Sequence, residues 1–238
     1  GRDKAKILFN NINRVDEKLF VHASFWYNTV FGSQRIADLL SEGLNVRYGC
    51  SVEKAVYRDG KWFIDDDCFD AVVFCGNLKQ LPSFVKGVDI APFDQEIDRL
   101  AFHGTTSVFC EIDANPYSWI YLPDEAYKCH RIICTGNFNR NANTDARITA
   151  TVEFTNELSK DDIFLNLERV PLHPKYIEHV FNPYSYPIQN PSSRSMIASL
   201  KVKLEPNNFF LLGRFAEWEY YNMDVAIGAA MDLSKKLV

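Results

Sequence analysis

The sequence predicts an α+β fold, in which a mostly antiparallel sheet packs with helices and a few further strands form a separate, parallel part. Strand-like runs dominate residues 105–155 and are separated by polar, turn-rich pieces. Two other runs, residues 71–75 and 209–212, are apolar throughout and are each followed by glycine, as in buried strands, and we expect them to lie side by side in the parallel part. The first run is typical of a strand buried on both faces. Apolar residues at helical spacing occupy both ends of the chain.

Helices are predicted at the start, in the middle and at the end of the chain. Apolar residues recur at helical spacing within residues 1–20, and the next helix is "SQRIADLLSEG", with Ser33 as its N-cap and Gly43 just beyond its end. Two more helices are "SKDDIFLNLERV" and "SSRSMIASLKVKL". The last helix is predicted to follow Asn222, a good N-cap, with Asp224 in its first turn.

Strands are predicted between these helices. The segment "LNVRYGCSVEKAVYRDGKWFIDDDCFDAVVFCG" alternates in the manner of strands, with Asp59-Gly60 as a hairpin turn. The runs "TTSVFCEI", "SWIYLP", "RIICTGNF" and "RITATVEFT" favour a single antiparallel sheet. The segment "YIEHVFNPYSYPI" is predicted to be extended and held in that conformation by its prolines.

The composition is that of an ordinary folded protein. Hydrophobic residues make up 47% and charged residues 24% of the 238 residues, and the net charge of -5 gives no electrostatic reason to expect a nucleic acid partner. The sequence contains no apolar run typical of a membrane span, and its polar beginning is unlike a signal peptide. We therefore expect a cytoplasmic protein that binds neither nucleic acid nor membrane. The sequence does not indicate an oligomeric state.

The six cysteines are expected to be reduced core residues, because most of them lie in apolar, strand-like runs. In "CHRIIC", Cys129 and Cys134 are expected to face opposite sides of a strand, so no metal site is predicted. The five histidines lack the mutual spacing of a catalytic triad or ligand set, and no role is assigned to them.

The connection between the last predicted strand and the last helix is rich in charged and aromatic residues. It begins at Gly213 and continues as "RFAEWEYY" up to Asn222. A strand-to-helix connection places a helix N-terminus where α/β proteins bind anionic ligands. An arginine and aromatic side chains here therefore indicate a small-molecule site.

This segment, "GRFAEWEYYNMD", resembles the closing motif of flavin-dependent proteins of the amine oxidase and protoporphyrinogen oxidase type, and most of all that of UDP-galactopyranose mutases. The stretch from "FGSQRIADLL" to "VVFCG" is similar to the family's helix, strand, hairpin and return strand, and "YSYPI" resembles a Tyr-Pro segment of the related oxidases. The resemblance covers most of the chain. It implies an FAD-dependent oxidoreductase or a flavin-dependent sugar-nucleotide mutase, in which the parallel strands are the remnant of a Rossmann-like FAD-binding lobe.

The resemblance also implies that FAD belongs to a longer protein than this chain. Proteins of this family begin with a βαβ unit that carries G-x-G-x-x-G, whose glycines let the backbone approach the FAD pyrophosphate. The sequence contains no such motif. We therefore expect a truncated portion of the enzyme, which binds no FAD by itself, or else a split or degenerate family member.

By resemblance, the closing motif supplies most of the site. Arg214 is the catalytic candidate, near the flavin ring and the substrate, where a guanidinium can hold a phosphate or a flavin carbonyl. Gly213, Met223 and Asp224 are expected to border the flavin, and Val52 matches a position that touches adenine in relatives. Arg214 is also expected to be a surface-facing charge that contributes little to folding.

Two tyrosines are the candidates for substrate binding. The resemblance implies that Tyr220 donates to a substrate diphosphate and that Tyr186 lines the substrate side of the cleft. Ala216 and Trp218 depart from the mutase motif, which has glycine and tyrosine there. These departures leave mutase and oxidase chemistry both open, and a nucleotide sugar is one option for the small-molecule substrate. The structural alternative for the candidates is ordinary packing, ion pairing and helix capping.

The chain is expected to form one compact unit. Residues 1–43 form a helical segment, and residues 44–80 the hairpin and return strand of the FAD-binding lobe. Residues 81–205 form the antiparallel substrate-binding domain, and residues 206–238 the closing strand and helix of the FAD-binding lobe.

Two functions remain open from the sequence. The chain is the substrate-binding and flavin-capping portion of an FAD-dependent enzyme, or it is a non-catalytic binding module that kept the fold without the cofactor. A G-x-G-x-x-G unit upstream in the reading frame would decide for the enzyme.

Overall fold

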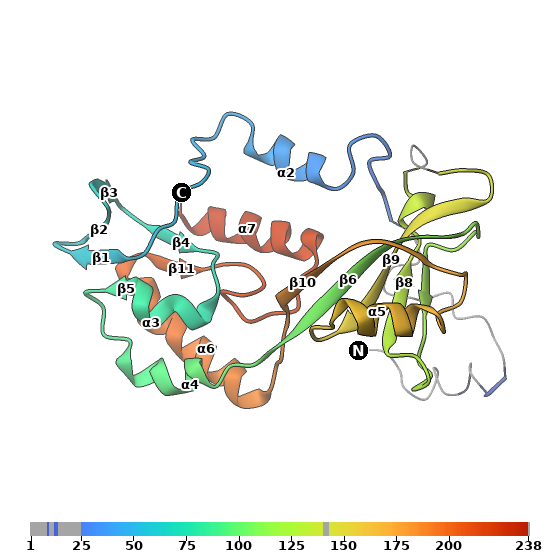
Figure 1. The fold of residues 1–238 in the computed structure, drawn as a ribbon. Coiled ribbons are helices and arrows are strands. Elements are labelled where there is room, and N and C mark those ends of the chain that lie inside the picture. Colours follow the sequence, from blue (N-terminus) through green and yellow to red (C-terminus); the bar gives the residue numbers. More distant parts are fainter. Residues whose placement is uncertain (1–8, 10–11, 14–24, 140–142, 238) are drawn as a thin grey trace.

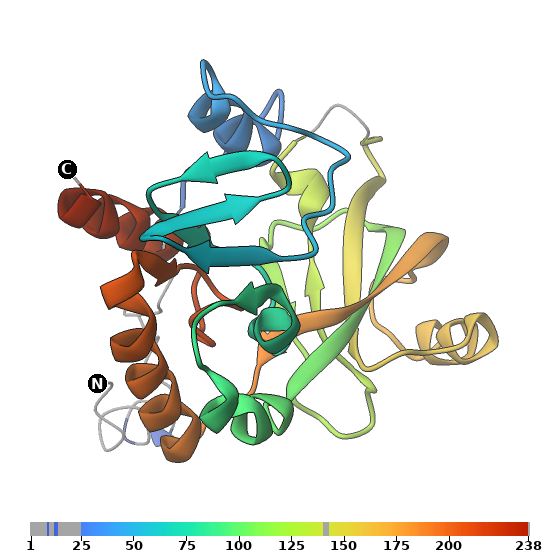
Figure 2. The same ribbon diagram turned by 90° about the vertical axis from the view of Figure 1, so that its left-hand side faces the viewer.

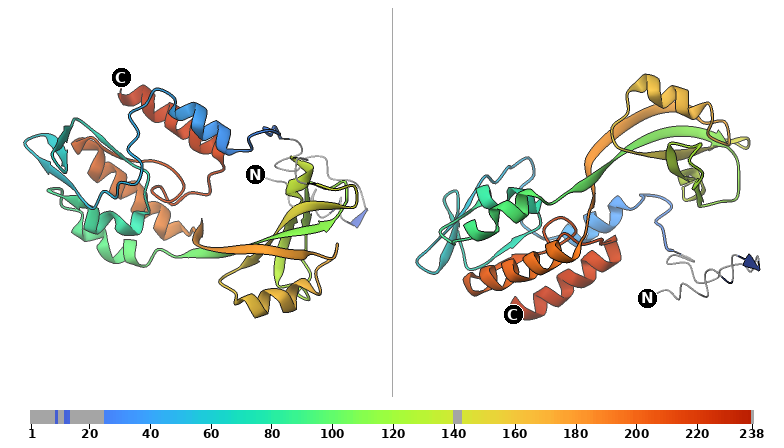
Figure 3. Two further views of the ribbon diagram at one scale, coloured as in Figure 1. Left: turned by 45° about the horizontal axis from the view of Figure 1, so that its top comes forward. Right: turned by 90° about the horizontal axis from the view of Figure 1, so that it is seen from below.

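The computed structural model describes residues 9, 12, 13, 25–139 and 143–237, most of which form two lobes (Figure 1). The first lobe comprises residues 55–101 and 188–237, the second lobe comprises residues 102–187, and each lobe has its own hydrophobic core. The long strands β6 (Phe102–Asp113) and β10 (Lys175–Pro187) run from one lobe to the other (Figure 3). The second lobe is thus inserted into the first.

Two small sheets and several helices build the first lobe. One sheet has the order β3-β2-β1-β5 and the other pairs β11 with β4. Figure 2 looks onto this lobe, with α6 and α7 along one side of its strands. The elements of this lobe and of the segment before it are α2 (Gln34–Ser41), β1 (Ala55–Arg58), β2 (Lys61–Ile64), β3 (Asp67–Phe69), β4 (Val72–Phe74), η1 (Leu78–Gln80), α3 (Leu81–Phe84), β5 (Val85–Lys86), η2 (Ala91–Phe93), α4 (Asp94–Asp98), α6 (Pro191–Leu204), η5 (Glu205–Asn207), β11 (Phe209–Leu211) and α7 (Met223–Leu237).

The two apolar runs lie side by side, as predicted. Strands β4 and β11 pair in parallel, with Val72 opposite Phe209 and Phe74 opposite Leu211. These four side chains are buried in the core of the first lobe. Val73 on the other face of β4 is 38% exposed, so the expectation of burial on both faces holds for one face only.

The second lobe is an antiparallel sheet with a helix on one face, which confirms the fold class. Its order is β10-β6-β9-β8-β7, and α5 packs against it through Ile163 and Leu167. The segment expected only to be extended forms the edge strand β10, whose register shifts between Asn182 and Tyr186, where Pro183 cannot donate a ladder hydrogen bond. The remaining elements are β7 (Trp119–Tyr121), β8 (Cys129–Ile133), η3 (Thr135–Asn137), β9 (Arg147–Thr155) and α5 (Lys160–Leu167).

Local sequence signals explain several of these boundaries. The hairpin between β1 and β2 turns at Asp59 and Gly60, which both have positive φ (52° and 79°), as a two-residue turn of type I′ requires. Helix α2 follows Ser33, although the Ser33 side chain makes no capping hydrogen bond. The helix expected within residues 1–20 lies outside the described residues, except for positions 9, 12 and 13.

The expectation that the six cysteines are core residues is only partly right. Only half of them are core residues: Cys110, Cys129 and Cys134 are buried, whereas Cys50, Cys68 and Cys75 are exposed. Cys129 and Cys134 do not face opposite sides, because both belong to the core of the second lobe. The ladder shifts register just after Cys129 and β8 ends before Cys134, so strict alternation does not apply. The described residues include no cluster of metal-binding side chains.

The residues that belong to each hydrophobic core show where one lobe ends and the other begins. Leu81, Val85 and Ile97, together with the buried residues of α6, pack in the first lobe rather than with the antiparallel sheet. The change from one core to the other falls near residues 101 and 188, not at residues 81 and 205. Within the part of the chain that the structure describes, no helix has the length and apolar character needed to cross a bilayer.

Candidate functional site

The closing loop, residues 213–222, joins β11 to α7 and is fixed by hydrogen bonds at both ends. Gly213 has a φ of 96°, which favours glycine, and its N–H donates to the buried carboxylate of Glu217 over 2.9 Å. Glu217 also pairs with Lys201 of α6. The Phe215 carbonyl accepts a bond from the Leu78 N–H over 3.1 Å. The loop is therefore a well-defined platform for the side chains that it carries.

Arg214 holds this loop against strand β10. Its Nε donates to the Tyr221 carbonyl over 2.8 Å, its Nη2 donates to the same carbonyl, and its Nη1 donates to the Ser185 carbonyl over 3.1 Å. The side chain is half-buried. The expectation of a weakly held surface charge is therefore wrong, because the guanidinium is bound by two backbone carbonyls that no sequence pattern indicates.

The two tyrosine candidates stack on each other beside Arg214. The rings of Tyr186 and Tyr220 lie 5.6 Å apart with an interplanar angle of 14°. The Arg214 guanidinium carbon is 5.5 Å from the Tyr186 ring centre and 5.3 Å from that of Tyr220. Tyr220 is 56% exposed, so it is not a core aromatic. The structure thus brings together three predicted site residues that come from two lobes.

A second arginine, Arg131, reaches one of these tyrosines, Tyr186, and was missed by sequence reasoning. Arg131 Nη2 donates to the Tyr186 hydroxyl over 3.0 Å, and Arg131 Nε binds the carboxylate of Glu153. His130 Nε2 lies 3.5 Å from that carboxylate. The one available signal was Glu153 itself, an acidic residue between the buried Val152 and Phe154 of an apolar strand.

The pair formed by Arg131 and Glu153 is charged in spite of its burial. Burial by itself raises the pKa of Glu153, but hydrogen bonds from His130 and Arg131 outweigh burial and leave the pKa below its ordinary value. Burial likewise opposes the charge of Arg131, whereas the bond to Glu153 raises its pKa. Both groups are therefore ionised at neutral pH.

Met223 and Asp224 form the first turn of α7, directly after the loop that Arg214 holds. Met223 is 51% exposed and Val225 is 46% exposed, so this end of the helix is open to solvent. The Asn222 carbonyl accepts the first intrahelical bond, from Ala226 N–H over 2.9 Å. A 15-residue helix with an open N-terminus carries partial positive charge there.

Of the two remaining cofactor-binding candidates, Gly213 lies next to Arg214 in the chain, whereas Val52 takes no part in the contacts of Arg214 with the stacked tyrosines. Gly213 adjoins Arg214, and no atom lies within 4 Å of a Cβ built on it, so another molecule can approach its backbone closely. Val52 precedes β1, is 42% exposed and takes no part in the contacts that join Arg214 to the tyrosines.

The two departures from the mutase motif point into the core of the first lobe. Ala216 and Trp218 are both fully buried, and Trp218 Nε1 donates to the Ile188 carbonyl over 3.1 Å. The packing interpretation is therefore right for Trp218. Its side chain does not lie on the surface that displays Tyr220.

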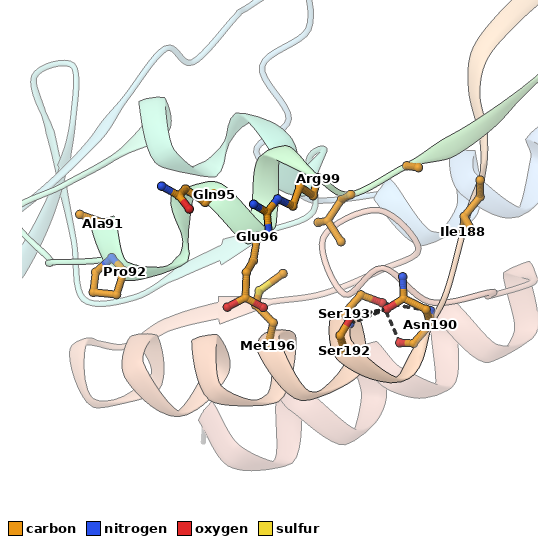
Figure 4. A pocket seen from close by; sticks show the side chains of 12 residues that line it. Ala91, Pro92, Gln95, Glu96, Arg99, Ile188, Asn190, Ser192, Ser193 and Met196 are labelled. Carbon is orange, nitrogen blue, oxygen red and sulfur yellow. Dashed lines mark hydrogen bonds between the residues drawn. The ribbon is translucent and has the colours of Figure 1, made fainter.

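A hollow among the described residues lies elsewhere (Figure 4). It has a volume of about 600 Å³ and lies between α4 and the N-terminus of α6, with Gln95, Glu96 and Arg99 on one side and Asn190, Ser193 and Met196 on the other. None of the predicted site residues lines it. The candidate residues lie outside this hollow, and Tyr220 among them is exposed to solvent.

Comparisons with solved structures agree with the fold class. The chain is similar to reduced UDP-galactopyranose mutase, with a TM-score of 0.75, 14% sequence identity and coverage of 92% of this chain and 53% of the other. It is also similar to a protein assigned as a protoporphyrinogen oxidase from Exiguobacterium sp. 255-15 (TM-score 0.64, 11% identity, coverage 87% and 51%). A putrescine oxidase variant with redesigned cofactor binding matches with a TM-score of 0.64, 12% identity and coverage of 86% and 52%.

These likenesses concern the fold alone, because the sequence identities are low. No family model matches the sequence, and no curated protein matches it. The chain spans about half the length of each solved structure. The chain thus has the fold of a portion of the amine oxidase-like proteins, as the closing motif implied.

Proposed function

We propose that this chain is the substrate-binding and flavin-capping portion of an FAD-dependent enzyme, either an oxidoreductase or a sugar-nucleotide mutase. The observation that carries the proposal is the parallel pair of β4 and β11, which leads through the Arg214 loop to the open N-terminus of α7. In open parallel sheets, ligands bind at the carboxyl ends of the strands. The loop leaves the sheet at that end.

The residues of the chain fit one end of a flavin. The backbone at Gly213 is open to close approach, and the first turn of α7 offers N–H groups and partial positive charge to an electron-rich ring. When bound, FAD would supply the redox or nucleophilic chemistry. Tyr186 and Tyr220 would hold a small-molecule substrate, with a nucleotide sugar as one option, and Arg214 would keep the loop in place.

The exposed apolar surface is consistent with a missing partner unit. In the described residues, β4 and β11 form a sheet of two strands only, so each has an unpaired edge. Helix α2 lies above α7 in Figure 1, and both helices display apolar side chains to solvent, which include Leu39, Leu40, Val225 and Met231. A βαβ unit with G-x-G-x-x-G would extend the sheet, cover these helices and bind the FAD pyrophosphate.

A non-catalytic module is the second candidate. It is favoured by Arg214, whose hydrogen bonds go to backbone carbonyls, as a structural residue requires. In this case the chain would keep the loop geometry without a flavin.

One experiment decides between the two. The product of the complete reading frame and the 238-residue chain are purified, desalted and examined for flavin absorbance. We expect flavin in the complete product and none in the chain alone. The complete product is then assayed with UDP-galactopyranose under reducing conditions and with amines under oxygen. A colourless complete product that takes up no added FAD would contradict the enzyme and leave the binding module.

A further inference from the structure

Glu153, Arg131 and Tyr186 form a continuous hydrogen-bonded chain on the face of the second-lobe sheet that α5 does not cover. Arg131 donates from Nε to the Glu153 carboxylate and from Nη2 to the Tyr186 hydroxyl, 3.0 Å away. The side chains of Arg131 and Glu153 are only 21% and 12% exposed. Water therefore competes weakly for these bonds.

The donor and acceptor roles fix the direction of the Tyr186 proton. A guanidinium has donors only, so the Tyr186 oxygen accepts the bond from Arg131. The hydroxyl proton must then point to another acceptor, and the hydrogen bonds among the described residues give it none. The ring is fixed as well, because it stacks on Tyr220. Tyr186 is thus oriented to donate to a bound molecule.

We propose that Arg131, held by Glu153, is a positioning residue that fixes the Tyr186 hydroxyl as a hydrogen-bond donor to an anionic oxygen of the substrate. This inference rests on the proposed function, which makes Tyr186 part of the substrate surface. Glu153 neutralises the charge of Arg131, but Arg214, whose guanidinium carbon lies 5.5 Å from the Tyr186 ring centre, forms no ion pair among the described residues. Its charge favours an acceptor with negative charge, a phosphate or a carboxylate. An arginine is suited to this role because its planar fork binds Glu153 and Tyr186 at once.

The test is a double-mutant cycle on the 238-residue chain. Binding of inorganic pyrophosphate and of malonate is measured by calorimetric titration for wild type, Arg131→Gln, Tyr186→Phe and the double variant. The tighter of the two probes identifies the acceptor as a phosphate or a carboxylate. Each single change is expected to weaken that probe by about tenfold, the effect of one oriented bond to a charged group. The double variant should bind no more weakly than Tyr186→Phe, because Arg131 acts through the hydroxyl that phenylalanine lacks.

Other outcomes overturn the proposal. If the fold-losses of probe affinity in the two single variants multiply in the double variant, Arg131 contacts the ligand directly. Unchanged affinity in Arg131→Gln, or the absence of binding of both probes to the wild type, would leave Arg131 with a structural role only.

Arg147→Gln is the matched control, because Arg147 pairs with Asp113 over 2.9 Å on the same sheet, outside the contacts of the tyrosines. It should lower stability and leave probe affinity unchanged. Equal weakening by Arg147→Gln would mean a general loss of lobe structure and would refute the proposal.

The outcome is separable from that of the proposed function. Anion binding to this chain needs no flavin. If the effects of the Arg131 and Tyr186 changes are non-additive but the complete product never acquires flavin, the proposed enzyme is refuted and the role of Arg131 stands. A flavin-loaded complete product with an additive cycle would refute the role of Arg131 alone.

Discussion

Arg214 is held by the backbone more firmly than an ordinary surface arginine. Three of its donor contacts end on the carbonyls of Tyr221 and Ser185, which belong to different lobes. These bonds join the closing loop to the edge strand β10. Any effect of Arg214 on catalysis must therefore be separated from its effect on the relative position of the two tyrosines.

Arg214→Ala is expected to lower the free energy of unfolding by about 1.5–3 kcal/mol, because it removes charged donors from two partly buried carbonyls. Chemical denaturation measures this. Arg47→Ala is the control, since Arg47 forms an exposed pair with Asp67 and should contribute about 1 kcal/mol or less. Equal effects of the two changes would contradict the anchoring role of Arg214.

The six thiols are expected to react in distinct groups. Cys50 and Cys68 are exposed and should react first with a disulfide reagent. Cys75 is also exposed but should be slower, because the surrounding protein partly desolvates its thiol and, together with the charge of Glu217, raises its pKa. Burial raises the pKa of Cys110 to about 12 and that of Cys129 to about 11, and it also protects Cys134. These three should react only in denaturant. Rapid reaction of all six in the native protein would contradict the core of the second lobe.

Glu153 predicts an acid-sensitive contribution to stability. Its pKa is depressed in the folded protein, so its contribution is fully present above its ordinary value of 4.5 and is lost as the pH falls below that value. The stability difference between wild type and Glu153→Gln should therefore shrink as the pH falls below 4.5. Denaturation at each pH measures it. A difference that grows as the pH falls below 4.5 would have the opposite sign and would reject the buried ion pair.

At the scale of elements, the pair β4 and β11 holds the first lobe together. Phe209 is fully buried, and its ring centre lies 4.9 Å from that of Trp62 and 6.1 Å from that of Phe74. The pair therefore joins the small mixed sheet to the strands that lead into the Arg214 loop. Loosening it should disturb the loop as well as the core.

Phe209→Ala is expected to cost about 3–5 kcal/mol of stability, because it leaves a cavity among packed aromatic rings. Val73→Ala in the neighbouring strand is the control, since Val73 is partly exposed, and it should cost about 1 kcal/mol or less. Thermal and chemical unfolding compare the two. A mild effect of Phe209→Ala would mean that this core is loosely packed.

The sequence was most informative where structure is decided locally. The turn at Asp59 and Gly60, the helices α5 and α6 and the apolar strands β4 and β11 follow from short patterns. The pairing of Arg131 with Glu153 could not be predicted, because it depends on the register between β8 and β9, which a bulge at the start of β8 alters. The carbonyl partners of Arg214 depend in the same way on the docking of two lobes.

At the scale of the whole molecule, the described residues form one lobe interrupted by another. Strand β4 is made before the second lobe, and its partner β11 is made after it. The two lobes meet again at the tyrosine stack, where Tyr186 comes from the insertion and Tyr220 from the closing loop. A change in either lobe can therefore reach the candidate site.

Because the first lobe is interrupted in the sequence, the two lobes can complete their folding only in a fixed order during translation. The inserted lobe is continuous in the chain, so it can fold as soon as it emerges, whereas β4 waits for β11 until the intervening residues have been translated. At about 5–20 residues per second this delay is on the order of ten seconds. During that time the apolar residues Val72 and Phe74 lack β11, the strand with which they pair in the described structure, and a nascent chain of this kind is a natural client for chaperones that bind exposed apolar segments.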